Sequence, residues 1–325
     1  MAPVNLGHVR TLALCIVIVP RDFSVVMPAA VGKGAGMRLF LLTSLVMVAF
    51  AANSVLNRAA LLAPEIDPLA FAWIRTVSGA AALLILVAAR DRSLAIWGPL
   101  RLPGALSLAL YMTTFSLAYV AIESGLGALI LFGGVQITMF AGALVAKEAI
   151  PVGRWIGAVM AFLGLIWLFW PSEAFELSML HAGLMLAAAL GWGIYSLVGR
   201  KAGEPLRASA SNFLLAAPLC VGLAMLAPVQ LDGAPTTPYG IGLALVSGVV
   251  TSAMAYALWY SVLPQLKVSV AGLAMVSPPV IAVLGGAVLL GEVITLKLLV
   301  ASALVLGGVA IGVLAPQRTS GSSGS

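Results

Sequence analysis

Polar and aromatic side chains are set into otherwise apolar stretches of this sequence, where they could bind a small molecule without covalent chemistry. They lie in five stretches: Asn53, Ser54 and Asn57; Tyr111, Thr114 and Phe115; Gln136 and Thr138; Trp192, Tyr195 and Ser196; and Tyr256, Trp259 and Tyr260. On a helix, spacings of three and four residues place such side chains on one face. Unpaired amide and hydroxyl groups are costly in apolar surroundings, so we expect these groups to point into the protein.

We predict that part of this set walls a central cavity. The predicted walls are Tyr111, Gln136, Trp192, Tyr195, Tyr256 and Trp259, and the further predicted contacts are Asn53, Asn57, Thr114 and Ser277. Such a cavity offers apolar surface with a few hydrogen bonds, which suits an amphipathic zwitterion. Hydrogen bonding between helices is the alternative, and it accounts for about as many of these residues.

Arg75 is the one charged residue that lies clearly inside an apolar stretch. A charge at such depth is by default a sign of function, and a guanidinium there could hold the carboxylate of a bound molecule. Alternatively, Arg75 extends toward the outer surface or pairs with Glu65, Asp67 or Glu123. Both interpretations remain open at this point.

No arrangement of residues predicts catalysis, a metal or a cofactor. The two cysteines, Cys15 and Cys220, are far apart, as are the two histidines, His8 and His181, so neither a disulfide nor a metal site is predicted. No GxxxxGK[ST] sequence occurs, which disfavours ATP as the energy source. A membrane enzyme would need His, Asp or Cys residues together and is therefore disfavoured as well.

The elements that must position these residues are predicted to be apolar helices. Hydrophobic residues make up 62% of the chain and charged ones 9%, which leaves too little polar surface for a water-soluble protein or for alternating barrel strands. Apolar runs reach about 20 residues, the length of a helix that crosses a membrane. We predict ten spans, at 39–60, 68–89, 102–121, 124–146, 153–170, 179–199, 208–228, 238–260, 269–290 and 296–314.

The placement of charge predicts the orientation of the chain. With the N-terminus inside, most of the 17 Lys and Arg fall on the cytoplasmic side of these spans, and most acids fall outside. Lys and Arg are favoured in cytoplasmic loops, so both termini are predicted to be cytoplasmic. The net charge of +6 is explained in this way without a nucleic-acid partner.

The sequence also repeats itself. GALVAKE at 142–148 and GAVLLGE at 286–292 lie 144 residues apart, at the same point of the apolar pattern. Five spans per copy is an odd number, so the second copy is predicted to cross the membrane upside down, an arrangement typical of secondary transporters. The predicted parts are an unstructured tail at 1–37, a first repeat at 38–172, an inverted second repeat at 173–315 and a flexible tail at 316–325.

Helix-breaking residues occupy matching positions in the two copies. Pro278 and Pro279 fall near the middle of the ninth predicted span, and Gly133 and Gly134 fall at the corresponding point of the fourth. Proline removes a backbone donor and glycine loosens a helix. Paired interruptions in inverted halves point to a central, gated binding site. A kink that only shapes helix packing is the alternative.

Small residues predict close contacts between helices. Gly153 and Gly157 in one span, and Gly308 and Gly312 in another, are spaced four apart. Such pairs let helix backbones approach in lipid. We predict that they serve packing or a dimer contact, so the protein is expected to be a monomer or a homodimer.

With these motifs the sequence resembles the drug/metabolite transporter superfamily, and within it the EamA-type exporters with ten helices. The resemblance covers about 38–315. It rests on VSPPVIAVLGGAVLLGE at 276–292, LFGGVQITMFAGALVAKE at 131–148, FAANSVLNR at 50–58, WGIYSLVGR at 192–200 and FAWIRTVSGA at 71–80. The first-half motif has two glycines where the family usually has proline. Glu148 and Glu292 end the repeated motifs, and we predict structural roles for both.

The resemblance implies a secondary transporter of the bacterial inner membrane that exports amino acids, neutral and aromatic ones included, or similar small metabolites. Because no acid lies deep in a predicted span, we expect facilitated movement or exchange by alternating opening of the two halves. The expected partners are the substrate and the lipid bilayer. An antiporter of phosphorylated metabolites or nucleotide sugars is an alternative, but it would need several buried cations. A drug efflux protein and a scaffold that transports nothing are the others.

Overall fold

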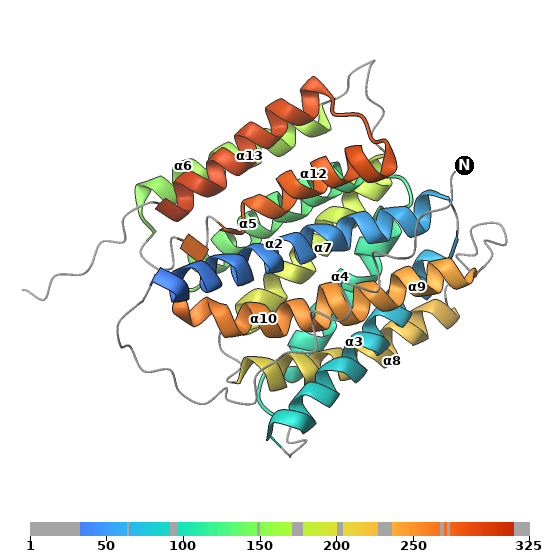
Figure 1. Ribbon diagram of the computed structural model, residues 1–325. Coiled ribbons are helices and arrows are strands. Elements are labelled where there is room, and N and C mark those ends of the chain that lie inside the picture. Colours follow the sequence, from blue (N-terminus) through green and yellow to red (C-terminus); the bar gives the residue numbers. More distant parts are fainter. Residues whose placement is uncertain are drawn as a thin grey trace, which may run out of the picture. The chain divides into compact units, whose positions relative to one another are not determined.

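The computed structural model describes residues 33–63, 65–91, 97–147, 150–170, 178–199, 204–226, 236–266, 270–271 and 274–314, and all regular structure within them is helical (Figure 1). Most residues of the two predicted tails lie outside these ranges. The described residues from Leu39 onward belong to one compact unit. The first seven helices are α2 (Lys33–Leu62), α3 (Pro68–Asp91), α4 (Arg101–Ala118), α5 (Ser124–Val145), α6 (Val152–Phe169), α7 (Met179–Gly199) and α8 (Pro205–Leu226). The others are α9 (Pro238–Val246), η1 (Ser247–Met254), α10 (Ala255–Val262), η2 (Leu263–Gln265), α12 (Ser277–Leu290) and α13 (Leu296–Leu314).

A helix lies at each of the ten predicted spans, and eight helical stretches are long and apolar enough to cross a membrane. These eight are α2, α3, α5, α6, α7, α8, the continuous stretch Pro238–Trp259, and α13. Two helices do not meet that measure. α12 has 14 residues, and α4 has 18 but carries Arg101 and several serines and threonines that lower its hydropathy.

The proline pair begins a helix instead of kinking one. α12 starts at Ser277, with Pro278 and Pro279 in its first turn, where the missing N–H of proline costs no hydrogen bond. Ala274 is helical, residues 275–276 form a turn and α12 follows, so the helical structure is interrupted directly before the two prolines. At its other end α12 stops at Gly291, whose φ of 71° is the left-handed conformation that glycine adopts without strain.

At Gly133 and Gly134, by contrast, the predicted interruption is absent. α5 runs unbroken from Ser124 to Val145. A β-carbon on Gly133 would lie 3.1 Å from Val305 Cγ1, and one on Gly134 would lie 2.6 Å from the β-carbon of Ala189. The two glycines therefore let α13 and α7 pack closely on α5, which is the alternative that the sequence had left open.

A departure from α-helical geometry that the sequence did not suggest lies in the stretch Pro238–Val262. Between α9 and α10 the chain forms the π-helical segment η1, in which each turn is wider than in an α-helix. At Gly248 this segment comes so close to α3 that a β-carbon would collide with the carbonyl group of Arg75 and the Ser78 hydroxyl. Nothing in the sequence analysis had predicted this feature.

The most extensive helix contacts join the first half of the chain to the second. α6 packs on α13, α4 on α7, and α3 on α8; Figure 1 shows α6 and α13 running side by side. Backbone approach at glycine makes two of these contacts close. A β-carbon on Gly157 would lie 2.8 Å from Gly312 N, and one on Gly191 would lie 2.8 Å from Tyr111 N. Two of the glycines predicted to pack helices thus meet within one chain, and the α4–α7 contact sets Tyr111 beside α7.

Candidate functional site

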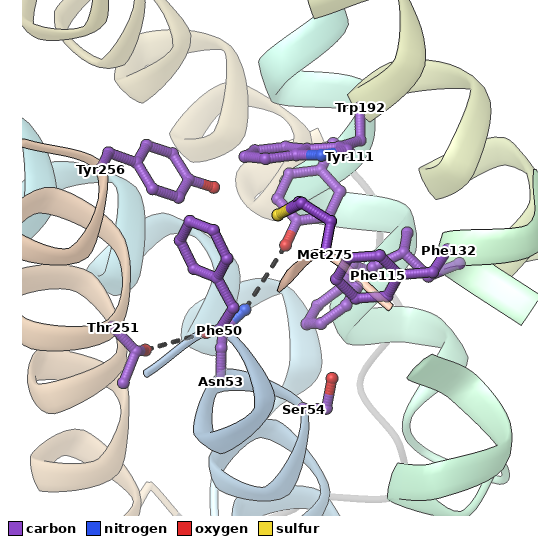
Figure 2. A pocket seen from close by; sticks show the side chains of 11 residues that line it. Phe50, Asn53, Ser54, Tyr111, Phe115, Phe132, Trp192, Thr251, Tyr256 and Met275 are labelled. Carbon is purple, nitrogen blue, oxygen red and sulfur yellow. Dashed lines mark hydrogen bonds between the residues drawn. The ribbon is translucent and has the colours of Figure 1, made fainter. Parts of the chain in front are cut away.

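A small cavity lies among residues that come from both halves of the chain (Figure 2). Its volume of about 30 Å³ is enough for a few water molecules and far below the roughly 300–1,000 Å³ of pockets that hold drug-sized ligands. Side chains therefore fill most of the centre in this conformation. The lining residues are Phe50, Asn53, Ser54, Tyr111, Phe115, Leu131, Phe132, Trp192, Thr251, Tyr256 and Met275.

Aromatic rings form most of the wall, and Trp192 of α7 stands at their centre. Its ring centroid lies 4.9 Å from that of Tyr111 and 5.1 Å from that of Tyr256. Phe50 packs edge-on against Tyr256 at 5.8 Å. Tilted and edge-on arrangements at these distances are favourable for aromatic pairs. Helices α2, α4, α7 and α10 thus each contribute a ring to one surface, which suits a flat or branched apolar group.

Asn53 is the polar centre of the cavity wall. Its side-chain oxygen accepts hydrogen bonds from Ser247 Oγ at 2.7 Å and Thr251 Oγ1 at 3.2 Å. Its Nδ2 donates to the Tyr111 hydroxyl at 3.4 Å, and Figure 2 shows this bond and the one to Thr251. A single amide therefore ties α2 to α4 in the first half and to η1 in the second.

Arg75 of α3 lies directly behind Tyr111 and is fully buried. Its Nε donates to Ser252 Oγ at 3.1 Å, and its Nη2 donates to the Tyr111 hydroxyl at 3.2 Å. The guanidinium carbon lies 5.3 Å from the ring centroid of Tyr111 and 5.2 Å from that of Phe115, within range of a cation–π attraction. Its Nη1 has no hydrogen-bond partner among the described residues.

These contacts bear on one of the two interpretations of Arg75, which has it extend to the outer surface or pair with a nearby acid. A side chain with no exposed surface does not extend to the membrane boundary. Of the three acids proposed as partners, Glu65 accepts from Thr237, Asp67 accepts from the first backbone N–H groups of α3, and Glu123 interacts with the charges of Arg58 and Glu292. Arg75 forms no ion pair within the part of the chain that the structure describes. The alternative of snorkelling or local pairing was therefore wrong.

Four of the predicted binding residues line the cavity: Asn53, Tyr111, Trp192 and Tyr256. Two more predicted residues do not line the cavity but pack against residues that do. Tyr195 stacks on Trp192 at 5.4 Å and donates to Ser209 Oγ, and Trp259 packs edge-on against Phe50 at 6.3 Å.

Apart from Arg75, which lies behind Tyr111, the other four predicted residues are not brought to the cavity. Asn57 donates to the Asn53 carbonyl oxygen and accepts from Ser116, so it links α2 to α4. Thr114 and Ser277 each bond a backbone carbonyl oxygen of their own segment, at 2.7 Å. The Gln136 amide lies toward Gly312 of α13. Contacts between helices describe the positions of Asn57 and Gln136 better than a cavity wall does, whereas Thr114 and Ser277 bond within their own segments.

Several cavity residues were missed by the sequence analysis or had no role assigned. Phe50, Leu131, Phe132 and Met275 are apolar, and apolar residues in an apolar helix give no signal of their own. Thr251 could have been found, because Ser247 and Thr251 are four residues apart and share a helix face. The partner of Arg75, Ser252, lies 177 residues away, and no local pattern predicts such a contact.

A second polar cluster joins the two halves at the ends of α4, α5 and α12. Both carboxylate oxygens of Glu292 are bonded by Ser124, one by its backbone N–H at 2.8 Å and the other by its hydroxyl at 2.5 Å. Arg58 Nε lies 3.7 Å from Glu292 Oε1. The same arginine donates to the carbonyl oxygens of Tyr119 and Val120. These contacts are in keeping with the predicted structural role of Glu292, whereas Glu148 lies outside the described residues.

Glu123 adds a pH-dependent element to this cluster. Burial raises the pKa of Glu123, and the charge of Glu292 raises it further, while Arg58 opposes the rise. An acid whose folded-state pKa is raised costs stability while it is charged, and this cost disappears as the pH falls through that pKa. We expect Glu123→Gln to raise Tm by about 1–3 °C at pH 7 to 8. The gain should shrink as the pH is lowered through the folded-state pKa, which lies above the ordinary 4.5.

Thermal unfolding of the detergent-extracted protein between pH 4.5 and 8 measures this effect. Glu204→Gln, at an exposed acid before α8, is the matched control and should show no such trend. A constant difference between Glu123→Gln and the wild type at every pH would contradict the prediction.

Comparisons with known proteins agree on the class of molecule. Residues 37–170 and 179–314 each match the model of the EamA-like transporter family. An uncharacterized protein of Pseudomonas aeruginosa is 42% identical over 283 residues, which cover 86% of this chain and 96% of that protein. The uncharacterized transporter YwfM of Bacillus subtilis is 29% identical over 267 residues, 79% of this chain and 88% of that protein.

A crystal structure also matches this chain, with a TM-score of 0.62. The matched region covers 88% of this chain and 99% of the chain in that crystal structure. At 19% identity the likeness concerns the fold alone.

Proposed function

Because the chain belongs to the EamA-like transporter family, we propose that it exports amino acids, neutral and aromatic ones among them, or similar small metabolites. It is a multi-pass membrane protein, and transport of a small molecule is the general function of its family. The membrane that we propose is the bacterial inner membrane, with both chain termini in the cytoplasm.

The observation that carries this proposal is the composition of the central cavity. Its rings come from α2, α4 and α5 in the first stretch that matches the family and from α7 and α10 in the second, so both stretches line the cavity. Apolar walls with few polar groups suit a ligand that is partly apolar and carries a small polar head. The amide of Asn53 and the hydroxyl groups around it would bind the polar head.

We propose alternating access as the mechanism, with ten membrane-spanning helices arranged as two inverted repeats. Substrate-sized space must then arise from movement of the aromatic side chains, because the cavity of about 30 Å³ is too small as it stands. No lining residue is acidic, which favours facilitated movement or exchange over proton-driven pumping. The contacts of α4 with α7 and of α3 with α8 join the halves and would have to rearrange during transport.

A transport panel in proteoliposomes tests the proposal. We expect the purified protein to move labelled neutral and aromatic amino acids down their gradients, with little change when a pH gradient is imposed. The panel also includes sugars, phosphorylated metabolites, nucleotide sugars and cationic dyes, which are the substrates of the alternative functions. Flux of these compounds without flux of amino acids, or accumulation driven by the pH gradient, would contradict the proposal.

A further inference from the structure

We infer that Arg75 is the anion-binding residue of the transport site and that it restricts the substrates to molecules with a carboxylate. This inference rests on the proposed function. It goes further, because an aromatic cavity alone would accept amines, amides and acids alike. Its starting point is a buried guanidinium that, among the described residues, donates to two hydroxyl groups and lies over two aromatic rings.

The charge of Arg75 is not compensated by the described part of the chain. Its Nη1 lacks a hydrogen-bond partner, and its side chain has no exposed surface. A buried cation without a counter-charge is costly, and a cation paired with an anion is much less so. An anionic group that reaches Arg75 would therefore gain a strong, charge-assisted interaction.

Among the described residues, no acid lies within ion-pair distance of Arg75. Glu65 is bonded to Thr237, Asp67 to the backbone N–H groups of Leu69 and Ala70, and Glu292 to Ser124. Each of these acids serves the end of a helix or a link between segments. The missing counter-charge is thus more naturally supplied by a ligand than by a rearrangement of these acids.

The geometry of the guanidinium favours a carboxylate in particular. Ser252 of η1 holds Nε, so the remaining two nitrogens, Nη1 and Nη2, present their donors side by side. Nη1 is free of hydrogen bonds to described residues, and Nη2 is held only by the Tyr111 hydroxyl. If Tyr111 turns away, both become available as a fork, which matches the two oxygens of a carboxylate.

Tyr111 connects this fork to the cavity. Its hydroxyl accepts from both Asn53 Nδ2 and Arg75 Nη2, and its ring lines the cavity beside Trp192 (Figure 2). A substrate carboxylate that displaces this hydroxyl would take over its bond from Arg75. The apolar part of the same molecule would then lie against Trp192, Tyr256 and Phe50, so one residue couples head-group binding to ring binding.

Three related compounds test the inference by thermal shift and by radioligand competition on the purified full-length protein. Phenylalanine carries both charged groups, 3-phenylpropionate carries only the carboxylate, and phenethylamine carries only the ammonium group. We expect wild-type protein to bind the two acids at least about 10-fold more tightly than phenethylamine. Arg75→Gln should lose about 10- to 100-fold in affinity for both acids and should no longer distinguish them from the amine.

Arg90→Gln is the matched control, because Arg90 lies on the same helix in an exposed position, and it should bind all three compounds as the wild type does. If Arg75→Gln does not fold, Arg75→Lys decides. Lysine keeps the charge but cannot form the fork, so affinity for the acids should fall while the preference over phenethylamine persists. Unchanged affinity of Arg75→Lys for the acids would overturn the inference.

The outcomes separate this inference from the proposed function. Transport of amino acids with equal binding of phenylalanine and phenethylamine, or with unchanged affinity in Arg75→Gln, overturns the role of Arg75 and leaves the proposed function standing. A wild type that binds none of the three compounds also overturns the inference. The proteoliposome panel then shows whether the proposed function falls with it.

Discussion

Replacement of Gly248 by valine is expected to abolish folding of the protein. A β-carbon at this position would collide with the backbone carbonyl group of Arg75, and its distance from the carbonyl carbon would be 3.0 Å. Backbone atoms cannot turn aside as a side chain can, so η1 and α3 would have to separate. Overpacking of a well-packed contact costs about 1–3 kcal/mol and sometimes more, and here it would also displace Ser252 from Arg75.

Size-exclusion chromatography after extraction in mild detergent measures this result as the loss of the monodisperse peak. Gly248→Ala should give a graded effect, with a folded protein of lower Tm. Gly242→Ala, in the preceding helix α9, meets nothing within 4 Å and should behave as the wild type. A Gly248→Val protein with wild-type yield and Tm would show that η1 and α3 do not pack as described.

Asn53→Leu is expected to reduce transport at least tenfold while the protein remains folded. The substitution removes the acceptor of Ser247 and Thr251 and the donor to Tyr111. Hydrogen bonds between helices in membranes contribute about 0.6 kcal/mol each, so three of them amount to roughly 2 kcal/mol. That loss lowers Tm without unfolding the chain, but the cavity loses the amide that orients its polar wall.

Initial rates of efflux from proteoliposomes, normalised to the amount of reconstituted protein, measure the effect. Thr43→Val is the control on the same helix, since the Thr43 hydroxyl bonds only to the Leu39 carbonyl oxygen one turn away, and it should transport at the wild-type rate. Asn53→Leu with full activity would remove Asn53 from the transport site.

The sequence was sufficient to predict a helix at each of the ten positions, because most of the apolar runs have the length that a membrane demands; α4 and α12 are the exceptions. It also predicted part of the site, since polar and aromatic side chains such as Asn53 and Tyr111 stand out in an apolar helix. It could not predict which of them face the cavity. Gln136 and Tyr195 belong to helices that are apolar on all sides, and in such helices the neighbouring helix decides which side chains line a space.

Residue type alone also failed at the helix break that was predicted in α5. Glycine can loosen a helix or let a neighbour come close, and at Gly134 the contact with Ala189 decides for the second role. Proline can kink a helix or begin one, and Pro278 does the latter. The π-helical segment was missed because SGVVTSAM has no pattern that separates it from an α-helix, and its wide turn is fixed by long-range contacts such as Gly248 with Arg75.

The uncovered Nη1 of Arg75 has a consequence for the kinetics of turnover. If a substrate carboxylate pairs with the guanidinium while the protein turns outward, the unloaded protein must return inward with the guanidinium desolvated and without a counter-charge. The inward return of the unloaded protein is then the slower half of the transport cycle. Unlabelled substrate added outside proteoliposomes should therefore accelerate the efflux of labelled substrate from their interior. Exchange is expected to be faster than net efflux.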